Sequence, residues 1–136
     1  MDRPAVRDAA LLIFRIIVGV IFVAHGYDKL FLTGLTETTG QFSAAGVPQP
    51  QASAWLATTA ELLGGALLVL GLLAAYVAGA LALLMVAAIW FLHVDAGFFT
   101  SQGGLEFPLL LAAALLMIIV FGPGRASLDG VLTARG

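Results

Sequence analysis

Residues 61–95 read ELLGGALLVLGLLAAYVAGALALLMVAAIWFLHVD, and no charged residue lies between Glu61 and Asp95. As a single helix this stretch would measure about 50 Å at 1.5 Å per residue, whereas the hydrocarbon core of a bilayer is about 30 Å thick. The stretch is therefore expected to fold back on itself. We place the turn between Gly71 and Tyr76, which gives two membrane spans at about 53–73 and 76–94.

The composition of the whole chain agrees with a small membrane protein. Of its 136 residues, 61% are hydrophobic and 10% are charged, and the mean hydropathy is +1.06. Soluble domains carry about 25% charged residues, so this balance argues against a soluble domain and equally against disorder. The absence of cysteine excludes disulfides and dithiol chemistry by the chain itself. A net charge of −2 with scattered basic residues argues against a nucleic-acid partner.

Two more apolar runs complete a predicted four-helix bundle. The first covers about 8–31, and the last covers about 105–121, where Gly122 and Pro123 stop it. Arg15 inside the first run, the length of that run and the lack of an A-x-A site favour a permanent span over a cleaved signal peptide. Residues 33–51, TGLTETTGQFSAAGVPQPQ, are rich in Gly and Pro and are expected to form a loop.

The predicted fold is thus all-α, a four-transmembrane-helix up-down bundle that forms one domain over residues 1–136. Four spans place both termini on one side of the membrane. That side holds Arg3, Arg7, Arg125 and Arg135, whereas the opposite side holds only Lys29. Because positively charged loops stay in the cytoplasm, we expect both termini to be cytoplasmic.

Three ionisable residues within the predicted spans need an explanation, because a charge near the bilayer centre costs roughly 2.5–3.5 kcal/mol: Arg15, Glu61 and, at a span start, Glu106. Arg15 lies about 10 Å from the cytoplasmic edge, and Glu61 lies near mid-membrane on a face with Ala57, Gly64 and Gly65. The depth difference predicts an Arg15–Glu61 ion pair. Three interpretations stay open: the pair fixes helix register, Arg15 extends to the interface instead, or Glu61 takes up and releases a proton.

A second polar group gathers where the spans reach the outer face, because antiparallel threading brings these ends together. It comprises His25, Asp28, Lys29, His93, Asp95 and Glu106. Each member has a plain structural explanation, as an interfacial histidine, a helix-end charge pair or an acid in a first helical turn. Their convergence favours a polar pocket.

Neither a haem site nor a metal site is expected from these residues. Nothing places His25 and His93 at matched depth, so a haem between them is not expected, and no metal-ligand spacing is present. The aromatic residues Trp55, Trp90, Phe98 and Phe99 fall near span ends and indicate an interfacial belt.

Several stretches together resemble the DoxX family of small four-span bacterial membrane proteins. They are LLIFRIIVGVIFVAHGYDKLF (11–31), AAGVPQPQASAWLATTAELLGG (44–65), the H-x-D-x-G-F-F and G-G-x-E-F-P link, and FGPGRASLD (121–129). Family members often carry a polar or basic residue in the turn between the second and third spans, where this chain has Ala74 and Ala75. The positions that match the family are Arg15, His25, Lys29, Glu61, His93 and Glu106.

The resemblance implies a multi-pass protein of the bacterial plasma (inner) membrane with a redox-associated role. Relatives include a membrane subunit of a thiosulfate-to-quinone oxidoreductase in archaea. In mycobacteria, a relative is the membrane partner that links a superoxide dismutase to a thiosulfate sulfurtransferase.

Our leading hypothesis is a membrane subunit of an oxidoreductase or oxidative-stress system, whose polar pocket opens outward and takes a quinone headgroup or a similar ligand. The candidate catalytic residues are Glu61, Arg15 and His25, and the candidate ligand-binding residues are Lys29, His93, Glu106 and Asp28. Since the chain lacks cysteine, electrons would come from a partner, such as a soluble redox enzyme, or from a bound cofactor. The alternatives are a non-catalytic membrane anchor for such an enzyme and a small proton-coupled transporter, which would need a second copy of the chain.

Overall fold

The computed structural model describes residues 4–93, 97–99, 104–124 and 127–135, and these residues contain helices and turns but no strand. The elements are α1 (Pro4–Tyr27), a π-helical turn η1 (Asp28–Leu32), α2 (Leu35–Ala44), α3 (Pro50–Leu70), α4 (Ala74–Ala88), a π-helical turn η2 (Ile89–His93), α5 (Glu106–Phe121) and α6 (Leu128–Arg135). The all-α prediction is confirmed.

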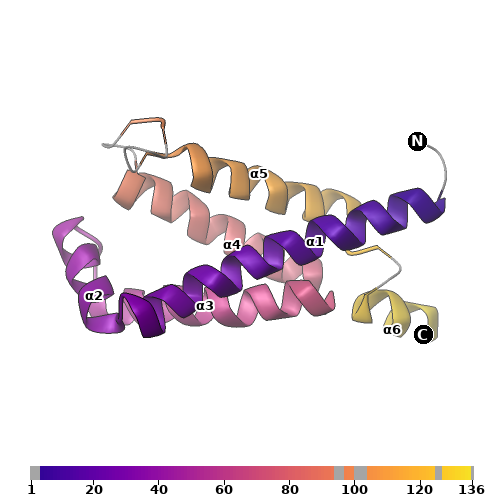
Figure 1. Cartoon of the computed structure of the whole chain (residues 1–136), viewed down its shortest axis with the longest axis horizontal. Helices are drawn as coiled ribbons and strands as arrows, with labels where there is room; N and C mark the ends of the chain where they lie inside the picture. The colour runs from indigo at the N-terminus through magenta and orange to yellow at the C-terminus, as the bar shows by residue number, and fades with distance from the viewer. Residues whose placement is uncertain (1–3, 94–96, 100–103, 125–126, 136) are drawn as a thin grey trace.

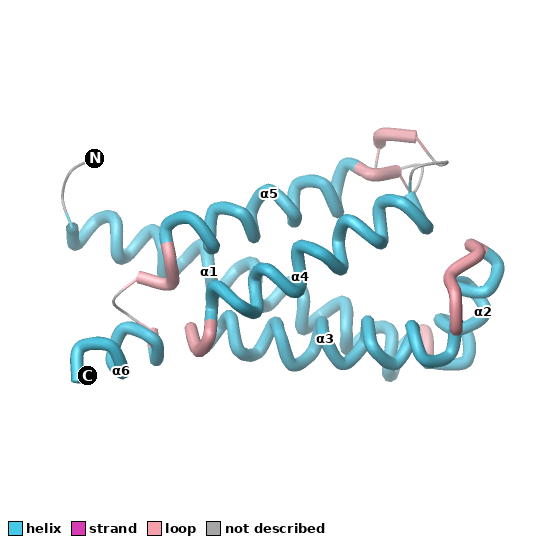
Figure 2. The backbone as a smooth tube through the Cα atoms, turned by 180° about the vertical axis from the view of Figure 1, so that it is seen from behind, coloured by secondary structure: helices cyan, strands magenta, loops and turns pink. Residues whose placement is uncertain are grey.

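Helices α1, α3, α4 and α5 lie along the long axis of the molecule and alternate in chain direction (Figure 1). Helix α1 packs mainly on α3, and α4 packs mainly on α5, with α3 and α4 joined by a short turn. The short helix α6 lies near the beginning of α1, whereas α2 crosses the opposite end of the bundle, as the view from behind also shows (Figure 2). The two ends of the bundle therefore differ in what covers them.

Three of these helical segments are long and apolar enough to cross a membrane, namely Pro4–Leu32, Pro50–Leu70 and Ala74–His93. Helix α5 is a shorter apolar helix, about 24 Å long at 1.5 Å per residue. Large apolar side chains cover the outside: Tyr76 is 80% exposed, Leu83 73% and Trp90 71%. An apolar exterior of this extent indicates contact with lipid.

The turn that divides the charge-free stretch begins at Gly71, as predicted. Gly71 has a φ of 72°, which a residue with a side chain rarely adopts. Its N–H donates to the Leu68 carbonyl at 3.1 Å, and the Leu72 N–H donates to the Leu67 carbonyl at 3.0 Å. These two hydrogen bonds form the Schellman motif, which ends a helix by satisfying its last carbonyl groups.

The expectation of a continuous loop over residues 33–51 is wrong, because α2 occupies its centre. Helix α2 lies between Gly34 and Gly46, which both have positive φ. Its side chain Phe42 is buried against Ala54 and Ala57 of α3. The glycines mark the ends of α2 correctly, but the packing of Phe42 is a tertiary contact that the Gly and Pro pattern does not report.

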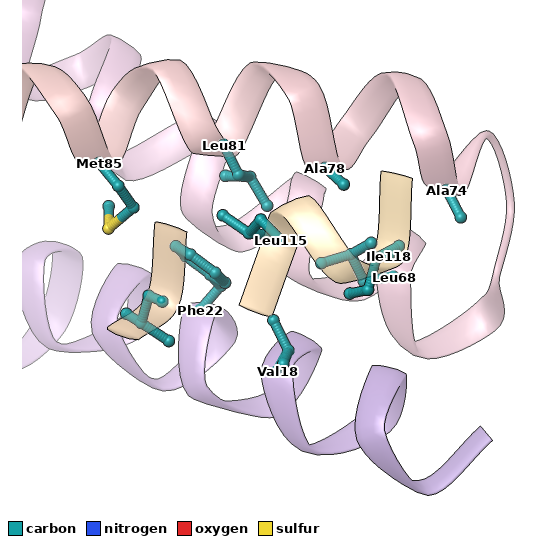
Figure 3. Close-up of a cluster of buried hydrophobic side chains, with 10 residues drawn as sticks. Val18, Phe22, Leu68, Ala74, Ala78, Leu81, Met85, Leu115 and Ile118 are labelled. Atoms are coloured by element: carbon teal, nitrogen blue, oxygen red, sulfur yellow. The ribbon is translucent and has the colours of Figure 1, made fainter. Parts of the chain in front are cut away.

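The main core lies between the four long helices. Figure 3 shows side chains from all four pointing into one interior. Its labelled members are Val18, Phe22, Leu68, Ala74, Ala78, Leu81, Met85, Leu115 and Ile118. The buried charged side chains Arg15 and Glu61 lie outside this apolar cluster.

Helices α1 and α3 approach each other closely where Gly19 faces Gly65. A Cβ atom at Gly65 would lie 2.6 Å from the Gly19 carbonyl oxygen and 2.8 Å from the Val23 nitrogen. Small residues allow this backbone approach, which is how helices often associate in membranes. The contact fixes which residues of α1 and α3 lie at the same level.

We predict that Gly65→Ala destabilises the protein by about 1–3 kcal/mol, because the added methyl group overlaps backbone atoms that have no room to move. The matched control is Gly79→Ala, since a Cβ there meets nothing within 4 Å. Reversible unfolding in detergent would measure both. Equal stabilities of the two variants would contradict the assigned helix contact.

Candidate functional site

An ion pair between Lys29 and Glu61 lies where α1 passes into η1. The Lys29 Nζ atom is 2.9 Å from Oε1 and 3.1 Å from Oε2 of Glu61. The Glu61 side chain is 5% exposed and the Lys29 side chain 21% exposed. Pairing lowers the cost of holding a carboxylate inside an apolar bundle, and removal of one partner would leave the other buried without compensation.

The predicted Arg15–Glu61 pair is wrong, and Lys29 takes the place expected for Arg15. Since Gly19 faces Gly65, Arg15 lies one turn further along and reaches the end of α3 near Val69. That level is about 12 Å along α3 from Glu61. The prediction failed because it estimated the depth of each residue from its own span, whereas helix packing decides the register.

Arg15 instead holds the end of α3. Its side chain is 2% exposed, its Nε donates to the Leu68 carbonyl at 2.7 Å, and an Nη donates to the Val69 carbonyl at 3.3 Å. The other Nη donates to the carbonyl of Pro123, beyond α5. The last carbonyl groups of a helix have no partner within the helix, so Arg15 satisfies them and ties α5 to the same point.

Asp129 satisfies free backbone N–H groups at the beginning of α4, as Arg15 satisfies carbonyl groups at the end of α3. Its carboxylate accepts hydrogen bonds from the N–H groups of Leu73 at 2.7 Å and Ala74 at 2.8 Å. Its own N–H donates to the Gly71 carbonyl at 2.9 Å. The sequence analysis quoted Asp129 in the FGPGRASLD stretch without giving it a role, because no local signal connects it to a helix that begins 55 residues earlier.

We predict that Arg15→Met lowers stability by at least about 2 kcal/mol, since buried carbonyl groups lose their donors. Arg15→Lys should recover only part of the loss, because an ammonium lacks the planar fork of a guanidinium. Unfolding in detergent gives both values. A variant as stable as the parent would show that these hydrogen bonds do not hold the turn.

The end of the bundle that α2 covers (Figure 1) contains a cavity of about 480 Å³. This volume is within the usual range of small-molecule sites. It is lined by α1, η1, α2, α3, α4, η2 and α5. Five of the predicted site residues line it: His25, Asp28, Lys29, Glu61 and His93. Most of the rest of its wall is apolar and includes Phe22, Leu84, Met85, Leu92, Phe107 and Leu111. The cavity thus joins one ion pair to a largely apolar interior.

The geometry of His25 leaves one ring nitrogen available. Its Nδ1 atom lies 2.9 Å from the Ile21 carbonyl oxygen, which only accepts hydrogen bonds, so Nδ1 carries the proton. In the neutral ring, Nε2 is then a hydrogen-bond acceptor. The imidazole also stacks on Phe107 of α5, with ring centroids 5.4 Å apart. These contacts hold the His25 ring of α1 against Phe107 of α5 at the cavity wall.

The remaining predicted residues occupy different places. Asp28 is exposed, and its Oδ1 accepts a hydrogen bond from the Thr33 hydroxyl at 3.2 Å. His93 ends η2 and is half-buried. Glu106 is exposed in the first turn of α5 and does not line the cavity, in contrast to its neighbour Phe107. Asp95, Arg3 and Arg125 lie outside the described residues, as does the side chain of Arg135.

Helix α2 adds cavity residues that the sequence analysis did not identify. Thr38 is 1% exposed, and its hydroxyl donates to the Gly34 carbonyl at 2.8 Å. Gln41 and Phe42 also line the cavity. The Gly and Pro pattern of residues 33–51 predicted a loop, so these side chains were not expected to face a cavity. Among the residues that the structure describes, no group of three or more His, Asp or Glu could hold a metal ion.

Comparison with known proteins shows the family of the chain. The DoxX family model matches residues 10–94, which include most of α1 and all of α2, α3 and α4. The chain belongs to the DoxX family. No solved structure matches it significantly.

Relatives of this DoxX chain occur in several bacteria. An uncharacterized protein of Haemophilus influenzae is 36% identical over 126 residues, which cover 90% of each chain. A Bacillus subtilis protein with the name "Putative oxidoreductase CatD" is 31% identical over 90% of this chain and 86% of its own. The Escherichia coli inner membrane protein YphA is 31% identical over 94% of both chains. Together with the helices long enough to span a bilayer, these relatives make this DoxX chain a multi-pass protein of the bacterial plasma membrane.

Proposed function

We propose that this DoxX protein is the membrane subunit of an oxidoreductase system and that its cavity binds the headgroup of a quinone. The observation that carries the proposal is the cavity itself, in which the Lys29–Glu61 pair lies in a mostly apolar wall. Ligand sites typically combine such walls with a few placed polar groups. The oxidoreductase name of the Bacillus subtilis relative supports the redox part.

The polar groups suit the chemistry of a quinone. Reduction of a quinone to a quinol takes two electrons and two protons. Glu61 is the proposed site of proton exchange, with its charge balanced by Lys29 rather than by Arg15. His25, whose Nε2 is an acceptor in the neutral ring, would contact a hydroxyl hydrogen of the quinol. His93 and Asp28 are proposed contacts at the cavity wall.

We propose that the electrons come from a partner or from a bound cofactor. The chain has no cysteine, and its described part holds no cluster of metal ligands. We propose a soluble redox enzyme as the electron donor, docked at the membrane surface. Arg15 and Glu106 lie outside the cavity lining, so we no longer assign a catalytic role to Arg15 or a direct ligand contact to Glu106.

A second candidate function is a membrane anchor that recruits a redox enzyme without binding a quinone itself. One observation favours it: Arg15 and Asp129 satisfy the backbone groups of helix ends, so two of the family-matching stretches have a structural explanation. An anchor would recruit its partner equally well with a filled cavity. The first experiment below separates the two functions.

We predict that Ala88→Phe weakens quinone binding strongly, because Ala88 lines the cavity and a phenyl ring there takes up space that a quinone ring would occupy. Ala80→Phe adds the same ring to the exposed face of the same helix and should bind as the parent does. Calorimetric titration with 2-methyl-1,4-naphthoquinone in neutral detergent measures both. Equal affinities, or no binding by the parent protein, would overturn the quinone proposal.

We also propose that both termini are cytoplasmic and that the cavity end faces outward. Because the chain has no cysteine, single-cysteine variants report the topology directly. Glu37→Cys on α2 and Leu132→Cys on α6 both replace exposed residues at opposite ends of the bundle. In intact cells, a thiol reagent that does not cross membranes should label only Glu37→Cys. Labelling of Leu132→Cys alone would reverse the orientation.

A further inference from the structure

The cavity end of the molecule holds a single basic side chain. Lys29 is the only Lys or Arg between residues 16 and 124, whereas the same interval contains Asp28, Glu37, Glu61, Asp95 and Glu106. The Arg15 side chain lies at the far end of the bundle, on the last carbonyl groups of α3. Of the Asp, Glu, Lys and Arg side chains that the structure describes, only Asp28, Lys29 and Glu61 line the cavity.

The positive charge of Lys29 is paired with the Glu61 carboxylate. The Lys29 ammonium lies within 3.1 Å of both Glu61 oxygens, and the Glu61 side chain is 5% exposed. An anion in the cavity would have to approach Lys29 beside a buried carboxylate. Two like charges about 4 Å apart repel each other by about 4 kcal/mol at an effective dielectric constant of 20. The Lys29 ammonium attracts the anion by a similar amount, so the neutral pair supplies little net attraction to offset the cost of removing the anion's charge from water.

The pair still offers hydrogen bonds to an uncharged ligand. An ammonium has three N–H donors, and the two carboxylate oxygens have about four acceptor positions. Two Lys29 contacts to Glu61 leave one donor on Lys29 and acceptor positions on Glu61. A ligand carbonyl group can accept from Lys29, and a ligand hydroxyl group can donate to Glu61. One arrangement therefore fits both the carbonyl and the hydroxyl form of a neutral molecule.

We propose that the cavity selects an uncharged, lipid-soluble molecule with a carbonyl or hydroxyl oxygen and excludes an anion of similar size, because Glu61 neutralises Lys29. This inference deepens the proposed function and rests on it for the location of the site. The charge selectivity is assigned to Glu61. The Lys29–Glu61 pair discriminates between neutral and anionic ligands, and the apolar walls contact the hydrocarbon part of the ligand.

The test compares three probes on the purified full chain in neutral detergent. They are 2-methyl-1,4-naphthoquinone, the same ring with a sulfonate group, and 2-naphthol, a neutral molecule that is not a quinone. Heats from the filled variant Ala88→Phe are subtracted, which removes binding to micelles. We expect the sulfonated probe to bind at least about tenfold more weakly than the neutral naphthoquinone. Equal or tighter binding of the sulfonated probe would overturn the inference.

Two variants assign the selectivity to the pair. Glu61→Gln keeps the shape of the side chain and frees the Lys29 charge, so the sulfonated probe should gain at least about tenfold in affinity. Glu37→Gln removes the same charge from an exposed position on α2 and should change the affinity little. An equal gain in both variants would overturn the role of Glu61. The wild-type comparison of probes stands even if Glu61→Gln fails to fold.

The probes also separate this inference from the quinone proposal. Binding of 2-naphthol without binding of either naphthoquinone would overturn the quinone proposal and support selection of neutral ligands. Strong binding of the sulfonated naphthoquinone would do the reverse, since the ring would bind regardless of charge. Failure of both neutral probes to bind would overturn the charge inference as well.

Discussion

The close contact of α1 and α3 at Gly19 and Gly65 is the constraint on which the rest of the structure depends. With no side chain between the two backbones, the helices have a single level at which they fit. That level puts Lys29 beside Glu61 and sends Arg15 past Glu61 to the end of α3. One steric contact between two glycines thereby sorts the charged residues of the bundle into two separate groups.

The two groups meet different physical needs. At the end near α6, the polar side chains serve backbone groups that a turn leaves without partners, which is costly in an environment without water. Arg15 donates to carbonyl groups, and Asp129 accepts from N–H groups. At the end covered by α2, the Lys29–Glu61 pair lines a cavity. Buried charge therefore indicates structure at one end and a proposed ligand site at the other.

Much of the fold followed from periodicity and length. The charge-free stretch had to turn, and Gly71 was a good place for the turn because glycine tolerates a positive φ. The cavity residues His25, Asp28, Lys29, Glu61 and His93 were also predictable as a group, because antiparallel spans bring their ends together. Helix α2 was missed because Phe42 packs on a distant helix, and Arg15 was paired wrongly for the same kind of reason.

The sequence by itself therefore determined that this is an all-helical membrane protein, that its charge-free stretch turns near Gly71 and that His25, Asp28, Lys29, Glu61 and His93 lie at one end of the bundle. These properties depend on local composition, helix length and chain direction. Only the tertiary structure decided that Glu61 pairs with Lys29, that Arg15 and Asp129 hold a turn, and that α2 covers a cavity. The reason is physical: the register between two helices depends on side-chain volume at their contact, which no single helix encodes.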